Sequence, residues 1–182
     1  RGDQKTQGIK NLEVCKDAHR RIIEGIALLR DDEECFRVFQ MANEAMQSQA
    51  SWSSRENGKA EKELIWRPFQ LAFALLTLSS VSDRSHPDRN ILDLIWFPTG
   101  GGKTEAYLLI SAYIIFLRRA KFNDSGGGVS VIMRYSLRLL TVQQFQRAAA
   151  MICACEIIRK RQPKILGRCA RVNMGLITTA IS

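Results

Sequence analysis

The sequence predicts an α/β fold in which helices cover a parallel sheet, preceded by a helical N-terminal region. From residue 91 onward, short apolar runs alternate with longer helical patterns in the order strand, helix, strand, helix, strand, and this order is typical of a parallel sheet covered by helices. Upstream of residue 63, apolar residues recur at helical spacing among charged ones. We therefore expect residues 1–62 to be a helical N-terminal region and residues 63–182 to be the first part of an α/β domain.

The N-terminal region is predicted to hold two helices. In residues 8–30, apolar side chains lie among charged ones at the spacing of an amphipathic helix. The acidic run at residues 31–34 favours the first turn of a second helix, because carboxylates are stabilised at a helix N-terminus. We expect that helix to extend to about Gln49 and the polar residues 51–62 to form a loop.

The elements of the α/β region follow in order. Pro68 suits the first turn of a helix that ends near Ser80, and residues 82–88 have the composition of a turn. The apolar run 106–117 is too short for a membrane span and predicts a helix buried on most sides. The remaining elements are expected as a strand at 91–97, a helix at 102–120, a loop at 123–128, a strand at 129–133, a long helix at 137–161 and a third strand at 171–178.

A glycine-rich segment, F-P-T-G-G-G-K-T at residues 97–104, separates the first expected strand from its helix. Such a turn lets backbone N–H groups close around phosphate oxygens, and the helix N-terminus adds positive potential. Lys103 is expected to reach the β- and γ-phosphates of ATP, and Thr104 to place its hydroxyl on Mg²⁺. The full set of expected nucleotide-contacting residues in this segment is Thr99, Gly100, Gly101, Gly102, Lys103, Thr104 and the following Glu105.

Upstream, W-R-P-F-Q at residues 66–70 resembles the R-P-x-Q form of the helicase Q motif. The resemblance implies that Gln70, with Arg67 beside it, reads the adenine, since a glutamine amide offers both a donor and an acceptor. The alternative is that these residues only begin an amphipathic helix. The general phosphate-loop pattern has glycine where this chain has Phe97, and superfamily 2 helicases relax that position.

The segment at residues 133–144 follows the second expected strand and resembles motif Ia of superfamily 2, in which an arginine precedes a glutamine by five residues. Arg138 and Gln143 match that spacing. We expect Arg134, Ser136 and Arg138 to hold nucleic-acid phosphates and Tyr135 to offer a stacking surface. The alternative is that these residues pack against and cap the following helix.

The net charge of +9 is unevenly distributed. Residues 1–100 hold 14 Lys and Arg against 15 Asp and Glu, whereas residues 101–182 hold 13 against 3. The excess of basic residues predicts binding to nucleotide phosphates, to a nucleic-acid backbone or to an acidic partner. The alternative is a solvated basic face balanced by acidic residues elsewhere.

The five cysteines include no C-x-x-C pair, which favours reduced thiols, no metal site and a cytoplasmic protein. His19 and His86 have no partners at ligand spacing and are expected at the surface.

Three segments of the chain together resemble the helicase subunit family of the bacterial DISARM anti-phage system, the DrmA family. They are W-R-P-F-Q-L-A-F, F-P-T-G-G-G-K-T-E-A-Y and M-R-Y-S-L-R-L-L-T-V-Q-Q-F-Q-R-A. The resemblance implies a RecA-like first helicase lobe and an ATP-dependent DNA motor with companion defence subunits. No D-E-x-H box follows the loop, and the chain starts at Arg1, so we expect an excerpt truncated before the Walker B acid. Alternatives are another P-loop ATPase and a nucleotide-gated DNA-binding scaffold that does not hydrolyse ATP.

Overall fold

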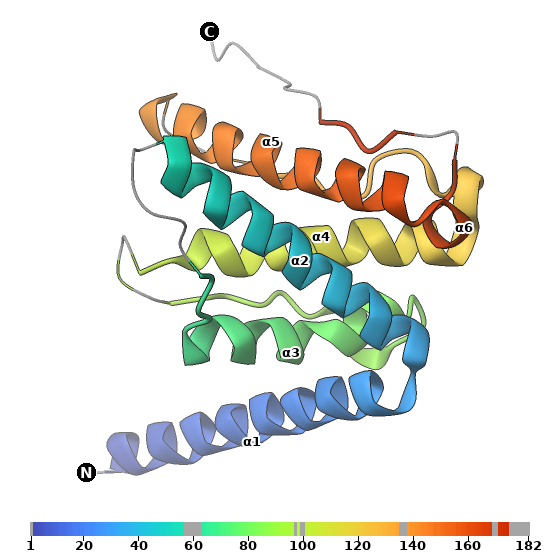
Figure 1. Ribbon diagram of the computed structural model, residues 1–182. Coiled ribbons are helices and arrows are strands. Elements are labelled where there is room, and N and C mark those ends of the chain that lie inside the picture. Colours follow the sequence, from blue (N-terminus) through green and yellow to red (C-terminus); the bar gives the residue numbers. More distant parts are fainter. Residues whose placement is uncertain are drawn as a thin grey trace, which may run out of the picture.

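The computed structural model describes residues 2–56, 63–96, 98, 101–134, 138–168 and 171–174, and long helices make up most of this part of the chain (Figure 1). Extended segments without regular structure connect them. The helices are α1 (Gly2–Asp31), α2 (Glu33–Glu56), α3 (Pro68–Ser82), α4 (Lys103–Phe122), α5 (Arg138–Arg161) and α6 (Pro163–Leu166), with short 3₁₀ helices η1 (Pro87–Asn90) and η2 (Asn123–Gly126).

The start of α2 follows from the acidic run that precedes it. The Asp32 carboxylate accepts a hydrogen bond from the backbone N–H of Cys35 at 2.9 Å, which satisfies one of the unpaired donors of the first turn. This hydrogen bond lowers the pKa of Asp32. Glu33 and Glu34 complete an acidic first turn. The prediction that this run opens a helix is confirmed, although α2 extends beyond Gln49 to Glu56.

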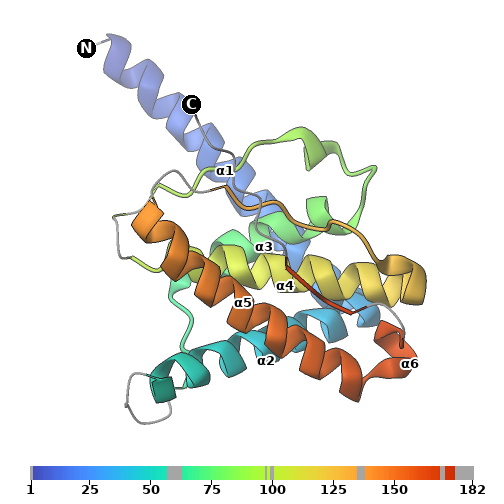
Figure 2. The same cartoon turned by 90° about the horizontal axis from the view of Figure 1, so that it is seen from above.

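Helix α4 lies at the centre of the bundle and packs against α2, α3 and α5 (Figures 1 and 2). Its Tyr113 and Phe116 are fully buried. The Tyr113 hydroxyl lies 2.8 Å from that of Ser82, and its ring meets Phe39 edge-on with centroids 6.4 Å apart. The prediction that the run 106–117 is a helix buried on most sides is confirmed.

Helix α1 crosses α3 at Gly25 with the two backbones in close approach. A Cβ atom at Gly25 would lie 2.0 Å from the Leu75 carbonyl oxygen, so no larger residue fits without displacing one helix. Arg21 fixes the same part of α1, because its guanidinium donates to both carboxylate oxygens of Asp93 at 2.6 and 2.7 Å. The first half of α1 extends away from the other helices (Figure 2).

The predicted parallel sheet is wrong. The described parts of the three expected strands, residues 91–96, 129–133 and 171–174, are extended but form no strand ladder. A strand buried on both faces would hide its apolar side chains, yet Leu92 and Trp96 are 94% and 90% exposed and Ile132 is 87% exposed. Residue 97 and residues 175–178, which complete the first and third expected strands, lie outside the described residues.

Helix side chains satisfy backbone groups that a neighbouring strand would satisfy in a sheet. Arg118 donates to the carbonyl oxygens of Gly127 and Val129 at 2.6 and 2.9 Å. The N–H of Val172 donates to the Glu156 carboxylate at 3.0 Å. An extended apolar run becomes a strand only when another strand pairs with it, and within the described residues these segments pair with long polar side chains of helices instead.

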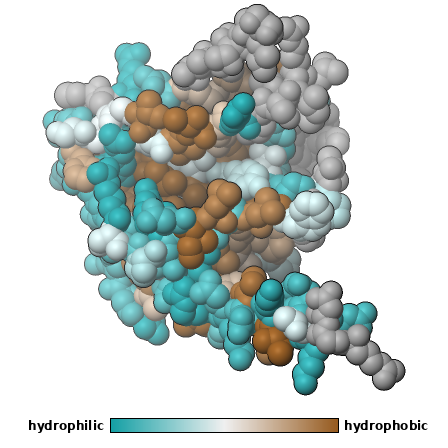
Figure 3. Space-filling view, turned by 180° about the vertical axis from the view of Figure 1, so that it is seen from behind, coloured by the Kyte–Doolittle hydropathy of each residue, from teal (hydrophilic) through white to brown (hydrophobic). Residues whose placement is uncertain are grey.

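Hydrophobic patches lie among polar side chains on the face opposite to that of Figure 1 (Figure 3). Across the described surface, the large apolar side chains that are more than two-thirds exposed are Val14, Ile65, Leu92, Leu94, Trp96, Val129 and Ile132. None of the helices in the described ranges is both long enough and apolar enough to span a membrane.

Candidate nucleotide-binding site

The glycine-rich segment turns directly into the first turn of α4. The N–H of Gly101 donates to the carbonyl oxygen of Pro98 at 3.1 Å, which closes a tight turn. Gly102 then adopts φ +90°, a conformation that favours glycine. Because α4 begins at Lys103 and no side chain caps it, its first backbone N–H groups have no acceptor inside the helix and can bind an anion. The predicted site residues Thr99 and Gly100 lie outside the described residues.

Arg67 and Gln70 hold the two glycine carbonyls of this turn. The Arg67 guanidinium donates to the carbonyl oxygen of Gly101 at 2.8 Å. The Gln70 amide donates to that of Gly102 at 2.7 Å, and a Cβ on Gly102 would lie 2.8 Å from the same Gln70 nitrogen. The structure therefore brings the R-P-x-Q segment and the phosphate-loop segment, which the sequence assigned to one site, into direct contact.

Both ends of the Gln70 amide are engaged with the protein. Its Nε2 donates to Gly102, and its Oε1 accepts the backbone N–H of Arg67 at 2.8 Å. Gln70 is only 4% exposed. In this conformation Gln70 links the start of α3 to the glycine turn, so the predicted contact with adenine would require one of these hydrogen bonds to be exchanged.

Side chains of α2 fix the segment that carries Arg67. The Trp66 indole N–H donates to the Asn43 side-chain oxygen at 2.8 Å, and the N–H of Leu64 donates to the Gln47 side-chain oxygen at 2.7 Å. Neither Asn43 nor Gln47 was predicted from the sequence. Their signal was weak, because two polar residues four apart on a helix are usually solvated. The glycine turn is therefore held by α3 directly and by α2 through one further layer of contacts.

The residues expected to contact phosphate and Mg²⁺ lie in the first turn of α4. The Lys103 ammonium donates to the carbonyl oxygen of Pro98 at 3.1 Å, on the loop itself. Thr104 is half-buried, and its hydroxyl is the group that could hold Mg²⁺ together with a bound nucleotide. Glu105 forms an ion pair with Arg147 of α5. Arg147 was not predicted from the sequence.

The residues expected to contact nucleic acid lie before and within the start of α5. Arg134 is exposed at the end of an extended segment, and Gln143 is exposed on α5. Arg138 is the first residue of α5, but its side chain is not among those described. Tyr135 and Ser136 lie outside the described residues.

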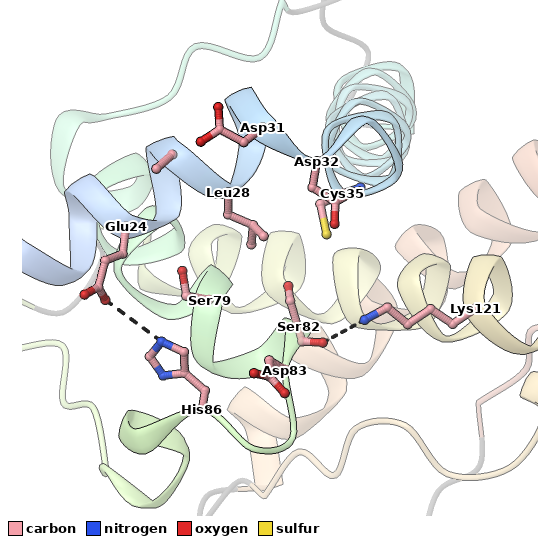
Figure 4. Close-up of a pocket in the computed structure, with 11 residues that line it drawn as sticks. Glu24, Leu28, Asp31, Asp32, Cys35, Ser79, Ser82, Asp83, His86 and Lys121 are labelled. Carbon is pink, nitrogen blue, oxygen red and sulfur yellow. Dashed lines mark hydrogen bonds and ion pairs between the residues drawn. The ribbon is translucent and has the colours of Figure 1, made fainter.

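A second cluster of polar residues surrounds His86. His19 is exposed, as expected, whereas the side chain of His86 is only 17% exposed and lines a pocket of about 510 Å³ between α1 and α3 (Figure 4). Ligand atoms of Glu24, His86 and Asp88 all lie within 4.8 Å of one another. The Arg20 guanidinium, however, donates to Glu24 at 2.7 Å and to Asp88 at 2.9 Å. Arg20 thus donates to both carboxylates, and Arg21 also lies 3.5 Å from Asp88. The two guanidinium groups compensate part of the negative charge that a metal ion would need, and this cluster ties α1 to η1.

Comparison with known proteins identifies a relative of the chain. No protein-family model matches it. The chain is similar to the DISARM protein DrmA of Bacillus paralicheniformis, with 44% identity over 163 residues. The match covers 81% of this chain but 15% of the relative, so the chain spans only a small part of that protein's length. At this identity over most of its own length, the chain is related to the DISARM protein DrmA.

Proposed function

We propose that this chain binds ATP and Mg²⁺ at the glycine turn and serves an ATP-dependent DNA helicase or translocase in anti-phage defence. The observation that carries the proposal is the glycine turn at the uncapped start of α4, with its carbonyls held by Arg67 and Gln70. The likeness to a DISARM protein supports the defence role and the expectation of companion defence subunits. The proposal rests on this turn and its neighbours and does not need a sheet in the described residues.

Each residue of the turn has a part in the proposed chemistry. The N–H groups that begin α4 bind the phosphate oxygens. Lys103 leaves the carbonyl oxygen of Pro98, 3.1 Å away, and neutralises the charge that develops on the transferred phosphoryl group. The Thr104 hydroxyl would hold Mg²⁺, which would supply positive charge to the bound phosphates. Arg67 and Gln70 keep the glycine carbonyls pointing away from the phosphates, because they occupy them with hydrogen-bond donors.

The basic excess after residue 100 is proposed to serve DNA. Residues 101–182 hold 13 Lys and Arg against 3 Asp and Glu, and Arg134 is exposed just before α5. Contacts with phosphates release counterions, so loss of one contact should lower the salt dependence of DNA binding by about one unit of slope, for all sequences alike. DNA binding by Arg134→Ala measured across salt concentrations tests this part of the proposal, and an unchanged slope would remove Arg134 from the DNA contacts.

A second candidate is a DNA-binding scaffold that nucleotide switches without hydrolysis. Its supporting observation is that Glu105, the carboxylate nearest the turn in sequence, is already paired with Arg147. Within the described part of the turn and the first turn of α4, no other acidic residue could help to hold Mg²⁺.

The steady-state ATPase rate of the full-length protein tests the proposal. Lys103→Ala should lower turnover by about 100-fold or more, because it removes a charge that balances the transition state. Lys121→Ala is the matched control: this lysine, at the other end of α4, also donates to a carbonyl, that of Ser82 at 2.8 Å, and its loss should leave turnover within about twofold. Unchanged turnover in Lys103→Ala would refute the proposed site. ATP binding that depends on Lys103 without any turnover would favour the scaffold.

A further inference from the structure

One face of α5 changes from apolar to polar along its length. Ala148, Met151, Cys155 and Ile158 are buried at helical spacing and join the core. One helical turn before Met151 and Ala148, the same face carries Arg147 and Gln144. Both are half-buried, and the Oε1 atom of Gln144 is buried without a hydrogen-bond partner. The face of α5 that packs against the core is therefore polar near the N-terminal end of the helix.

Arg147 meets the phosphate-loop end of α4. Its guanidinium contacts the carboxylate of Glu105, the residue that follows Lys103 and Thr104 in the chain. The other carboxylate oxygen, Oε2, is buried and has no hydrogen-bond partner, and a Cβ on Gly102 would lie 3.4 Å from it. The carboxylate thus lies between the arginine of α5 and the last glycine of the turn.

The ion pair is partly withdrawn from water. The side chains of Arg147 and Glu105 are 32% and 23% exposed, and burial lowers the pKa of Arg147. In such a setting each charge depends on the other, because removal of one partner leaves the second poorly solvated. The exposed pair between Arg161 of α5 and Glu44 of α2, at 2.6 Å with side chains 57% and 47% exposed, lacks this property.

We propose that Arg147 is a positioning residue through which nucleic acid bound near the start of α5 controls the phosphate loop. This inference rests on the proposed function. If α5 shifts when DNA binds, Arg147 moves with the helix. The Glu105 carboxylate must then either move with the guanidinium or lose the ion pair. Since Glu105 adjoins Thr104 and lies against Gly102, its movement changes the geometry of the turn that holds the phosphates. ATP turnover therefore depends on DNA through this pair.

The ATPase rate of the full-length protein, with and without a single-stranded oligonucleotide, tests the inference. We expect Arg147→Ala to lower the stimulation ratio by about fivefold or more, with the KM for ATP in the absence of DNA changed by less than about twofold. Arg147→Lys should restore part of the ratio, because it keeps the positive charge on a side chain of different shape. Arg161→Ala, which breaks the exposed pair of the same helix, should leave the ratio unchanged.

The possible outcomes distinguish failure of this inference from failure of the proposed ATPase function. A normal stimulation ratio in folded Arg147→Ala would overturn the positioning role and leave the ATPase proposal intact. Wild-type protein without any ATPase activity would overturn the proposed motor, and this inference with it. If Arg147→Ala fails to fold, Arg147→Met makes the same test, because it keeps an apolar stem on α5 and removes the charge that pairs with Glu105. The double variant Glu105→Arg with Arg147→Glu should then recover part of the stimulation.

Discussion

The two ends of α4 are held in different ways. At its N-terminal end, the glycine turn is held by the exposed Arg67, by Gln70 and by its own Lys103, each donating to a single backbone carbonyl. At its C-terminal end, the Asp124 carboxylate accepts the N–H of Arg168 at 2.7 Å, and Arg159 donates to the carbonyl oxygen of Gly167 at 2.7 Å.

The two ends of α4 therefore differ in whether their side chains can exchange a hydrogen-bond partner for a ligand. At the N-terminal end, the exposed Arg67 and the half-buried Lys103 can each leave a carbonyl for a ligand at small cost, and only Gln70 is buried. Arg159, by contrast, is only 4% exposed, and a Cβ on Gly126 would lie 2.7 Å from the Arg118 carbonyl oxygen. Changes at the C-terminal end should therefore lower stability, whereas changes of Arg67 or Lys103 at the N-terminal end should alter binding and leave stability nearly unchanged.

Arg159→Met should give the largest effect on stability. It removes hydrogen bonds to two carbonyl oxygens and to both oxygens of Glu156, and it leaves that carboxylate without its arginine partner. We expect a loss of about 3 kcal/mol in the free energy of unfolding, measured by denaturant titration. The affinity for ATP of the surviving folded protein should stay within about twofold. A large loss of affinity without a loss of stability would erase the distinction between the two ends.

Acid should weaken the same end selectively. Hydrogen bonds from Arg159 and from the N–H of Val172 lower the pKa of Glu156 from 4.5 to about 2. A group whose folded pKa is lowered stabilises the protein above its unfolded pKa, so this contribution is complete above about pH 4.5 and is lost as the pH falls to about 2. We expect up to about 3 kcal/mol to be lost across this window.

Glu156→Gln provides the control for the acid prediction. It should be less stable than wild type at neutral pH and should lose less stability between pH 4.5 and 2. Thermal unfolding at a series of pH values measures both proteins. If the two curves fall in parallel, Glu156 is not the group responsible.

Gln70→Ala should have the smallest of these effects on nucleotide binding. Loss of the hydrogen bond to Gly102 should weaken every nucleotide by about fivefold, which corresponds to about 1 kcal/mol. If the amide also reads adenine, ATP should lose a further similar factor that GTP does not. Competition binding with ATP and GTP measures the two losses. Equal losses would restrict Gln70 to holding the turn.

Local patterns predicted the helices well, and they picked out two segments that the structure brings into contact. The apolar run 106–117 is long and continuous, and only a buried helix accommodates it, as α4 shows. The glycine turn and the R-P-x-Q segment each carry a local signature, and the structure brings Arg67 and Gln70 to Gly101 and Gly102.

The strands were mispredicted because pairing is not a local property. Residues 91–97 have the same apolar composition whether a neighbour pairs with them or not, and nothing in the run itself reveals that Leu92 and Trp96 are exposed. Arg147 was missed for a related reason. The only sign of it in the sequence is an arginine on the same face of the helix as Met151 and Ile158. The sequence alone does not show that this face of α5 packs against the core.

Hydrogen–deuterium exchange of the full-length protein, with and without ATP and Mg²⁺, tests most directly whether phosphate binds at the N-terminal end of α4. The N–H groups that begin the helix have no acceptor within it, so a bound phosphate should slow their exchange. We predict protection in residues 98–106, a smaller change in residues 67–70, and no change in residues 123–128 and 163–168 at the other end. Unchanged exchange in residues 98–106 at saturating ATP would contradict the account.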